Sequence, residues 1–269
     1  MNSRGIWINW LNSTPRSNQM SEAKKISPGL SLNAPDVSSR QKIFILGFNR
    51  CGTQSFSAAL EKIGIGCAHW DQNRLALAIA NDINQGRKID LDAHYPQCNA
   101  FMDIINVPGH GQINKRPWIE GNQFARELVK SYPDAYFILN TRPVNDWINS
   151  RLKHVNGDFI EQYRQDKLRH ANQKLSKEEI ILDWRYQWHK HHAEILELFS
   201  YNPSLKSLIF DITTSPYSSL KTFLSPDYSL FGDTMPWVGQ TASATQAPDQ
   251  KGFKHTVKNV AKKIFKSKA

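Results

Sequence analysis

A glycine-containing segment near the start of the chain has the composition of an anion-binding loop. It reads Gly47-Phe48-Asn49-Arg50-Cys51-Gly52-Thr53-Gln54-Ser55 and lies between a short apolar run and a helical pattern. Two glycines, Gly47 and Gly52, stand five residues apart and let the backbone wrap around a phosphate, and the first N–H groups of the helix, at residues 53–55, have no partner within it. This segment, the phosphate loop, predicts an oxyanion site; an ordinary glycine-containing turn is the alternative.

The position of the positive charge distinguishes this loop from that of a P-loop kinase or nucleotidase. Those enzymes place a lysine directly after the second glycine, followed by a Ser or Thr for magnesium. Thr53 stands at the lysine position here, and the cation is Arg50, two residues before Gly52. We therefore expect Arg50 to reach the phosphate from the loop. A P-loop nucleotide kinase remains an alternative function, although its lysine is absent.

A second segment offers another arginine and a serine at a suggestive spacing. Residues 136–140 form an apolar, strand-like run, and Arg142-Pro143 then opens a helix at a position that tolerates proline. Ser150 follows Arg142 by eight residues, a little over two helical turns, so both side chains can converge on a further anion. A surface ion pair for Arg142 and a neutral helical Ser150 are the simpler interpretations. The apolar-biased face of this helix comprises Val144, Trp147, Ile148, Arg151 and Leu152.

Alternating strand and helix patterns must position these residues. Apolar runs predict strands at 43–46, within 64–70, and at 100–104, 135–140 and 208–212. Amphipathic spacing predicts helices at 53–63, within 74–84, and near 120–131, 143–155 and 178–199. The first run is apolar throughout, which is typical of a strand buried on both faces. The order predicts an α/β fold: a three-layer P-loop-type domain with a mainly parallel central sheet flanked by helices.

Together, the phosphate loop and the segment from residue 137 to Ser150 resemble the two binding segments of sulfotransferases that use 3′-phosphoadenosine-5′-phosphosulfate (PAPS). The resemblance covers about residues 42–240 and includes a late strand and helix at 208–224. It implies transfer of a sulfuryl group from PAPS, as co-substrate and without a metal, to a hydroxyl of an acceptor. The acceptor class stays open among carbohydrates, lipids and small metabolites, because acceptor pockets are built from variable loops such as 71–99, 105–122 and 156–177.

The resemblance also implies roles for individual residues. In the family, the loop holds the 5′-phosphosulfate, while an Arg and a Ser eight residues apart hold the 3′-phosphate. The 5′ end would accordingly contact Arg50, Cys51, Gly52, Thr53, Gln54 and Ser55, and the 3′-phosphate would contact Arg142 and Ser150. Gln54 departs from the family's Ser or Thr but keeps its amide donors. Cys51 is also unusual, and we expect a small filler rather than a reactive thiol.

Three residues are candidates for the general base of this reaction. The base must lie beside the acceptor at the carboxyl ends of the parallel strands, and His69, Asp103 and, less well, His94 are expected there. Related sulfotransferases present a His or an acid from the place of Asp103, so Asp103 is our first expectation and His69 the second; a turn-capping Asp103 is the alternative. Arg50 is expected to stabilise charge on the leaving phosphate.

A histidine cluster, His189, His191 and His192, invites a metal interpretation. Its members lie one, two and three residues apart, without the i, i+4 pair that aims two imidazoles at one zinc ion. We expect no metal site, and instead a helix that packs its apolar face inward, with His192 near the acceptor cleft.

The chain's formal net charge of +10 lies in its ends. Residues 1–42 contribute +4 and residues 250–269 contribute +7, which leaves a nearly neutral body, so nucleic acid is excluded as a partner. We expect a disordered extension at 1–41, the sulfotransferase-like domain at 42–240, and a linker with a basic amphipathic helix at 241–269. That helix either contacts an anionic membrane or docks on the domain.

The location of the protein is predicted from its cysteines and its apolar segments. Three widely spaced cysteines, Cys51, Cys67 and Cys98, argue against a disulfide framework, and neither a membrane-spanning run nor a signal peptide is recognisable. A cytoplasmic protein, with peripheral membrane contact through its end, is the expectation. A non-catalytic nucleotide-binding or membrane-associated interaction protein is the alternative from a different functional class.

Overall fold

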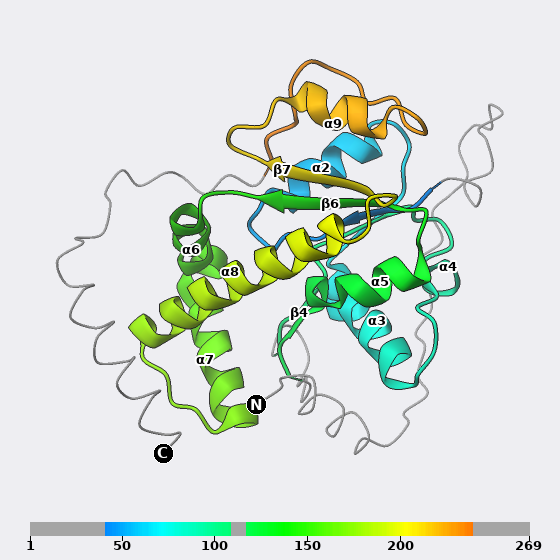
Figure 1. Cartoon of the computed structure of the whole chain (residues 1–269). Helices are drawn as coiled ribbons and strands as arrows, with labels where there is room; N and C mark the ends of the chain where they lie inside the picture. The colour runs from blue at the N-terminus through cyan, green and yellow to red at the C-terminus, as the bar shows by residue number, and fades with distance from the viewer. Residues whose placement is uncertain (1–40, 109–116, 239–269) are drawn as a thin grey trace, which may run out of the picture.

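A five-stranded sheet in which every pairing is parallel forms the centre of the molecule (Figure 1). The computed structural model describes residues 41–108 and 117–238. The strand order is β2-β3-β1-β6-β7, and the strands are β1 (Ile43–Ile45), β2 (Cys67–His69), β3 (Ala100–Met102), β6 (Tyr136–Thr141) and β7 (Lys206–Asp211). The predicted α/β fold with a mainly parallel sheet is confirmed. Of the predicted extension at 1–41, all but residue 41 lies outside the described residues, as do the predicted linker and basic helix at 241–269.

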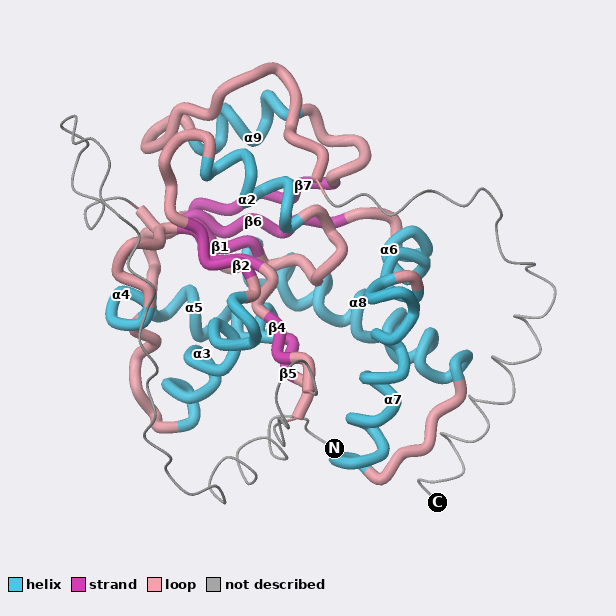
Figure 2. Tube along the Cα trace, turned by 180° about the vertical axis from the view of Figure 1, so that it is seen from behind, coloured by secondary structure: helices cyan, strands magenta, loops and turns pink. Residues whose placement is uncertain are grey.

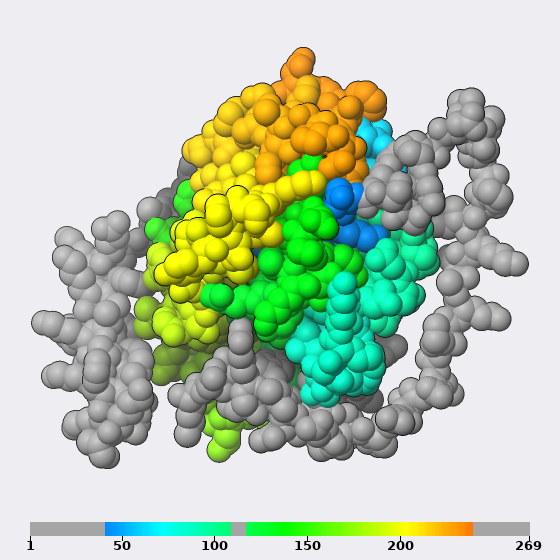
Figure 3. Space-filling model, turned by 45° about the vertical axis from the view of Figure 1, so that its right-hand side comes forward, coloured from blue at the N-terminus to red at the C-terminus, as the bar shows by residue number. Residues whose placement is uncertain are grey.

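Helices cover both faces of this sheet (Figures 1 and 2). One face carries α2 (Thr53–Glu61) and α9 (Tyr217–Leu224), and the other carries α3 (Arg74–Asn84), α5 (Ala125–Ser131) and α8 (Lys177–Ser200). The apolar run of β1 explains this arrangement: Ile43 and Ile45 pack with α2 and α9, whereas Phe44 and Leu46 pack on the opposite side. Successive strand residues point to opposite faces, so a continuous apolar run needs helices on both. In the space-filling view, α8, α5 and the α3 region form one continuous surface (Figure 3).

A further group of helices packs against the phosphate loop. It consists of α6 (Val144–Leu152), η4 (His154–Gly157), α7 (Asp158–Ala171) and part of α8, packed around an aromatic core that comprises Phe48, Trp118, Trp147, Phe159, Tyr163 and Trp184. The expectation of an acceptor loop at 156–177 is wrong for most of that segment, because α7 occupies it. The helix buries only Phe159, Tyr163 and Asp166, so its apolar pattern was too sparse to predict it.

Short elements complete the described chain. They are η2 (Asp71–Asn73), α4 (Leu91–His94), η3 (Gly121–Phe124) and an antiparallel ribbon of β4 (Ile105–Asn106) and β5 (Ile119–Glu120). Within residues 41–108 and 117–238, none of the helices has the length and apolar character needed to cross a membrane. All five strands of the main sheet run in the same direction, so the residues that follow them gather at one edge.

Candidate active site

A cavity of about 290 Å³ lies at the carboxyl edge of the sheet. Each strand delivers residues to it: the phosphate loop after β1, His69 at the end of β2, Asp103 after β3, Arg142 after β6 and Ile212 after β7. Of the predicted residues, Cys51, His94 and His192 do not line it, whereas the following do: Arg50, Gly52, Thr53, Gln54, Ser55, His69, Asp103, Arg142 and Ser150. The lining residues that were not predicted are Asn49, His154, Ile212, Thr213, Trp237 and Val238.

The phosphate loop turns into α2 through left-handed backbone conformations. Arg50 has a φ of 69° and Gly52 a φ of 79°, a region that glycine adopts without strain. A Cβ atom on Gly52 would also lie 3.0 Å from the Ile212 side chain. Thr53, Gln54 and Ser55 at the start of α2 line the cavity. The expectation for the Ser55 amide is wrong, because this N–H donates to the Gly52 carbonyl at 2.9 Å.

Side chains of the β6–α6 segment hold the backbone of this loop. Asn140, which is fully buried, accepts a hydrogen bond from the Gly47 N–H at 2.6 Å and donates one to the Cys51 carbonyl at 2.6 Å. A Cβ atom on Gly47 would lie 1.9 Å from the Asn140 carbonyl oxygen, so only glycine fits there. The Trp147 indole N–H donates to the Asn49 carbonyl at 3.0 Å. The two binding segments thus form one structural unit.

The two predicted anion-binding groups meet in the cavity. Arg50 Nε donates to Ser150 Oγ at 3.1 Å, and Arg142 Nη1 donates to the Arg50 carbonyl at 3.2 Å. Burial lowers the pKa of Arg50, against the opposing effect of Asp103, but a guanidinium stays charged in proteins. Arg142 Nε is buried and has no hydrogen-bond partner among the described residues. A buried guanidinium N–H that lacks a partner fits an anionic ligand, since such groups are otherwise satisfied.

Asp103 and His69 lie together at the same edge, 3.8 Å apart between Asp103 Oδ2 and His69 Nε2. His69 Nε2 also lies 3.0 Å from Thr53 Oγ1, so this nitrogen is engaged with the phosphate loop. Asp103 Oδ1 is buried and has no hydrogen-bond partner in the described part of the chain. Burial raises the pKa of Asp103, while nearby His69 counteracts the rise. Asp103 therefore has a carboxylate oxygen that no described residue engages, whereas His69 Nε2 already contacts Thr53.

Three other predicted residues do not line the cavity. His94 ends α4, which precedes β3, and its Nε2 lies 3.4 Å from Asp82 Oδ2; its expected position at the carboxyl edge is wrong. Cys51 is buried in the aromatic core, where burial raises its pKa to about 12, as suits a filler. His192 is buried beside Thr141, with Nε2 2.7 Å from Thr141 Oγ1, and does not line the cavity.

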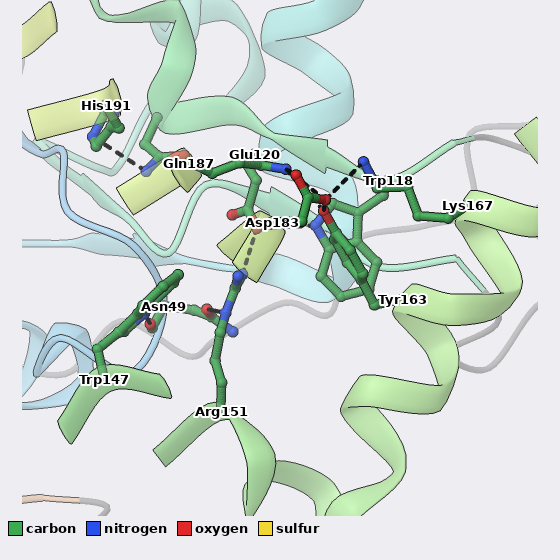
Figure 4. A network of polar contacts seen from close by, with 11 residues as sticks. Asn49, Trp118, Glu120, Trp147, Arg151, Tyr163, Lys167, Asp183, Gln187 and His191 are labelled. Atoms are coloured by element: carbon green, nitrogen blue, oxygen red, sulfur yellow. Dashed lines mark hydrogen bonds and ion pairs between the residues drawn. The ribbon is translucent and has the colours of Figure 1, made fainter. Parts of the chain in front are cut away.

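One buried ion pair near the loop was missed by sequence reasoning. Arg151 pairs with Glu120 and donates from Nε to Asn49 Oδ1 at 2.9 Å (Figure 4). The sequence contained one indication of this pair: Arg151 lies on the apolar-biased face of the predicted helix, where a charged residue needs a buried partner.

All three cysteines are free thiols. Among residues 41–108 and 117–238, no three His, Cys, Asp or Glu side chains are grouped so as to hold a metal ion.

Comparison with known proteins agrees with this geometry. A profile described as a sulfotransferase domain matches residues 42–115 and 117–202, more than half of the chain. The match contains the phosphate loop, Asp103 and the β6–α6 segment, whereas β7 and α9 lie beyond it. A search of curated proteins found no match. On the strength of this profile, the chain belongs to the sulfotransferase family.

Proposed function

We propose that the protein transfers a sulfuryl group from PAPS to a hydroxyl group of an acceptor. Family membership supports sulfotransfer in general, and the choice of donor is supported by one observation: two anion-binding groups face the same cavity. The phosphate loop with Arg50 forms the first, and Arg142 with Ser150 forms the second. A nucleotide with anions on both its 5′ and its 3′ side satisfies both groups, including the unpartnered Arg142 Nε.

The residues of the cavity divide the chemistry between them. Arg50 and the start of α2 hold the 5′-phosphosulfate and stabilise the charge that builds up on the leaving phosphate. Asp103 accepts the proton of the acceptor hydroxyl while that oxygen bonds to sulfur and the bond from sulfur to the bridging oxygen breaks. The products are the sulfated acceptor and 3′-phosphoadenosine-5′-phosphate (PAP). Arg142 and Ser150 hold the 3′-phosphate and so orient the donor.

His69 has a supporting role in this proposal. Its ring lies between Thr53 at the start of α2 and the Asp103 carboxylate. In this position it orients the carboxylate and, when protonated, stabilises the ionised form of Asp103.

Calorimetry with PAP and ATP tests the choice of donor. PAP should bind with micromolar or better affinity in the absence of magnesium, because both anion-binding groups use arginine and backbone donors. ATP lacks a 3′-phosphate and should bind at least about tenfold more weakly, with or without magnesium. Magnesium-dependent ATP binding that is tighter than PAP binding would overturn the proposal and favour a kinase.

A further inference from the structure

Arg151 lies behind the phosphate loop and does not face the cavity. Its side chain is almost completely buried, and its guanidinium lies 4.7–5.6 Å from the ring centres of Phe48, Trp147, Phe159 and Trp184. Nη2 pairs with the Glu120 carboxylate, and Nε donates to Asn49 Oδ1 at 2.9 Å. The planar fork of arginine allows both contacts at once, which a lysine ammonium in the same place does not reproduce.

Asn49 links this buried pair to the reacting groups. Its side-chain oxygen accepts from Arg151, its carbonyl oxygen accepts from Trp147, and the next residue is Arg50 in its left-handed conformation. A non-glycine residue in that conformation is strained and needs its surroundings to hold it. With Asn49 fixed at two atoms, the backbone that precedes Arg50 cannot rotate into a more relaxed form. Both contacts therefore oppose relaxation of the loop at Arg50.

Glu120 anchors the other end of the pair to the helical cluster. The same carboxylate oxygen accepts from the Trp118 indole N–H at 3.0 Å (Figure 4). The Trp118 amide donates to Asp166 Oδ1 on α7 at 2.8 Å. A continuous series of polar contacts thus connects Asp166 on α7 with Asn49 in the phosphate loop, through Trp118, Glu120 and Arg151. A buried ion pair is rarely more stabilising than a well-packed apolar pair of similar size, so stability alone does not account for it.

We propose that Arg151 is a positioning residue for the donor: paired with Glu120, it fixes Asn49 and thereby the conformation of Arg50 that receives the 5′ group. The inference rests on the proposed function only for the identity of the ligand, because the conformation of the loop can be measured without one.

The test separates positioning from folding by removing the ion pair in two ways. Arg151→Met alone leaves the Glu120 carboxylate buried and unpaired and should destabilise the protein strongly. Arg151→Met combined with Glu120→Met removes both charges and should restore the melting temperature to within a few degrees. Arg126→Met combined with Glu197→Met removes an exposed ion pair between α5 and α8 and serves as the matched control.

Hydrogen exchange of the ligand-free full chain provides the first measurement. In the Arg151→Met/Glu120→Met protein, amides of residues 47–55 should exchange at least about tenfold faster, while those of α8 and β6 stay at the wild-type rate. Asn49→Ala, which leaves the ion pair in place, should have the same effect, and adding it to the double variant should change little. Wild-type exchange in this segment would overturn the proposal, whatever ligand the protein binds.

Ligand affinity provides the second measurement. PAP should bind about tenfold more weakly to the double variant, whereas adenosine 3′-phosphate, which lacks the 5′ group, should bind as it does to wild type. An unchanged PAP affinity, or an equal loss for both ligands, would contradict a positioning role at the 5′ end. If wild-type protein does not bind PAP, the proposed function fails, and the exchange measurement alone decides the role of Arg151.

Discussion

Asp103 combines the properties that a general base needs. Its carboxylate faces the cavity, Oδ1 has no partner among the described residues, and burial raises its pKa above the ordinary value of 3.8. Its backbone has a φ of 53°, a conformation that an L-residue keeps only when its surroundings hold it. The strained backbone and the unpartnered oxygen belong to the same residue, at which the proposed mechanism places the acceptor hydroxyl.

The Asp103→Asn variant tests this role. Sulfuryl transfer should fall about 100-fold or more, because the amide cannot accept the proton, whereas PAP affinity should stay within about twofold of wild type. In the wild-type protein the rate should fall with decreasing pH as Asp103 is protonated, at a pH above the ordinary range for aspartate, and the variant should lack this limb. PAP release from PAPS with a panel of alcohols and phenols is the readout. A variant with near wild-type turnover would remove Asp103 from the role.

The sequence predicts the residues that bind an anion but not those that hold the loop backbone. Arg50, Arg142 and Ser150 were predicted because their side-chain chemistry and spacing indicate an anion. The role of Asn140 depends on the pairing of β1 with β6, which brings its amide between Gly47 and Cys51, and a one-dimensional pattern does not specify that register. His154 also lines the cavity, and its position four residues after Ser150 could have predicted this from the sequence.

At the scale of elements, α8 supports the site from behind with two neutral histidines. His191 Nε2 donates to the Leu46 carbonyl at 2.8 Å, directly before the phosphate loop. His192 donates from Nδ1 to the Trp188 carbonyl at 2.8 Å and approaches Thr141 Oγ1 through Nε2. Burial lowers the pKa of His191 to about 3 and that of His192 to about 4. The helix therefore packs in this way only while both rings are uncharged.

These shifts predict a loss of stability at acidic pH. A histidine in the unfolded chain binds its proton near pH 6.5, whereas the folded rings do so only near pH 3–4. The free energy of unfolding therefore has its full value above pH 6.5 and decreases as the pH falls from there towards pH 3–4. Each histidine should contribute a loss of about 2 kcal/mol at pH 5. Urea unfolding at pH 7 and pH 5 measures this change. His192→Gln should show a shallower dependence on pH, and a slope equal to that of wild type would contradict the assignment.

The helices also show what a hydrophobic pattern can and cannot predict. The bounds of α2, α3 and α8 follow their apolar spacing closely, and α8 begins with a Ser176–Glu179 capping box. The segment that forms α7 was expected to be a loop, because the helix rests on two aromatic residues and on polar contacts such as Tyr163 Oη to Asp183 at 2.7 Å. Such contacts depend on tertiary packing, which a local pattern does not reveal.

For the molecule as a whole, the parallel sheet is the feature that makes the site possible. The alternation of strands and helices was enough to predict it, because a strand that is apolar on both faces needs helices on both sides. The order of the strands then brings residues 50, 69, 103, 142 and 212 to one edge. The sequence carried the chemical identity of these residues, and the topology supplied their proximity.

The proposed function requires that one cavity bind both phosphates of a single nucleotide. Its most direct test compares calorimetric affinities for PAP and for 5′-AMP, which differ only in the 3′-phosphate, in wild type and in Arg142→Gln, with the exposed Arg126→Gln as control. Arg142→Gln should weaken PAP binding about 10- to 100-fold and leave 5′-AMP within about threefold of wild type, so the advantage of the 3′-phosphate is lost. An Arg142→Gln protein that still prefers PAP by the wild-type factor would contradict the proposed function.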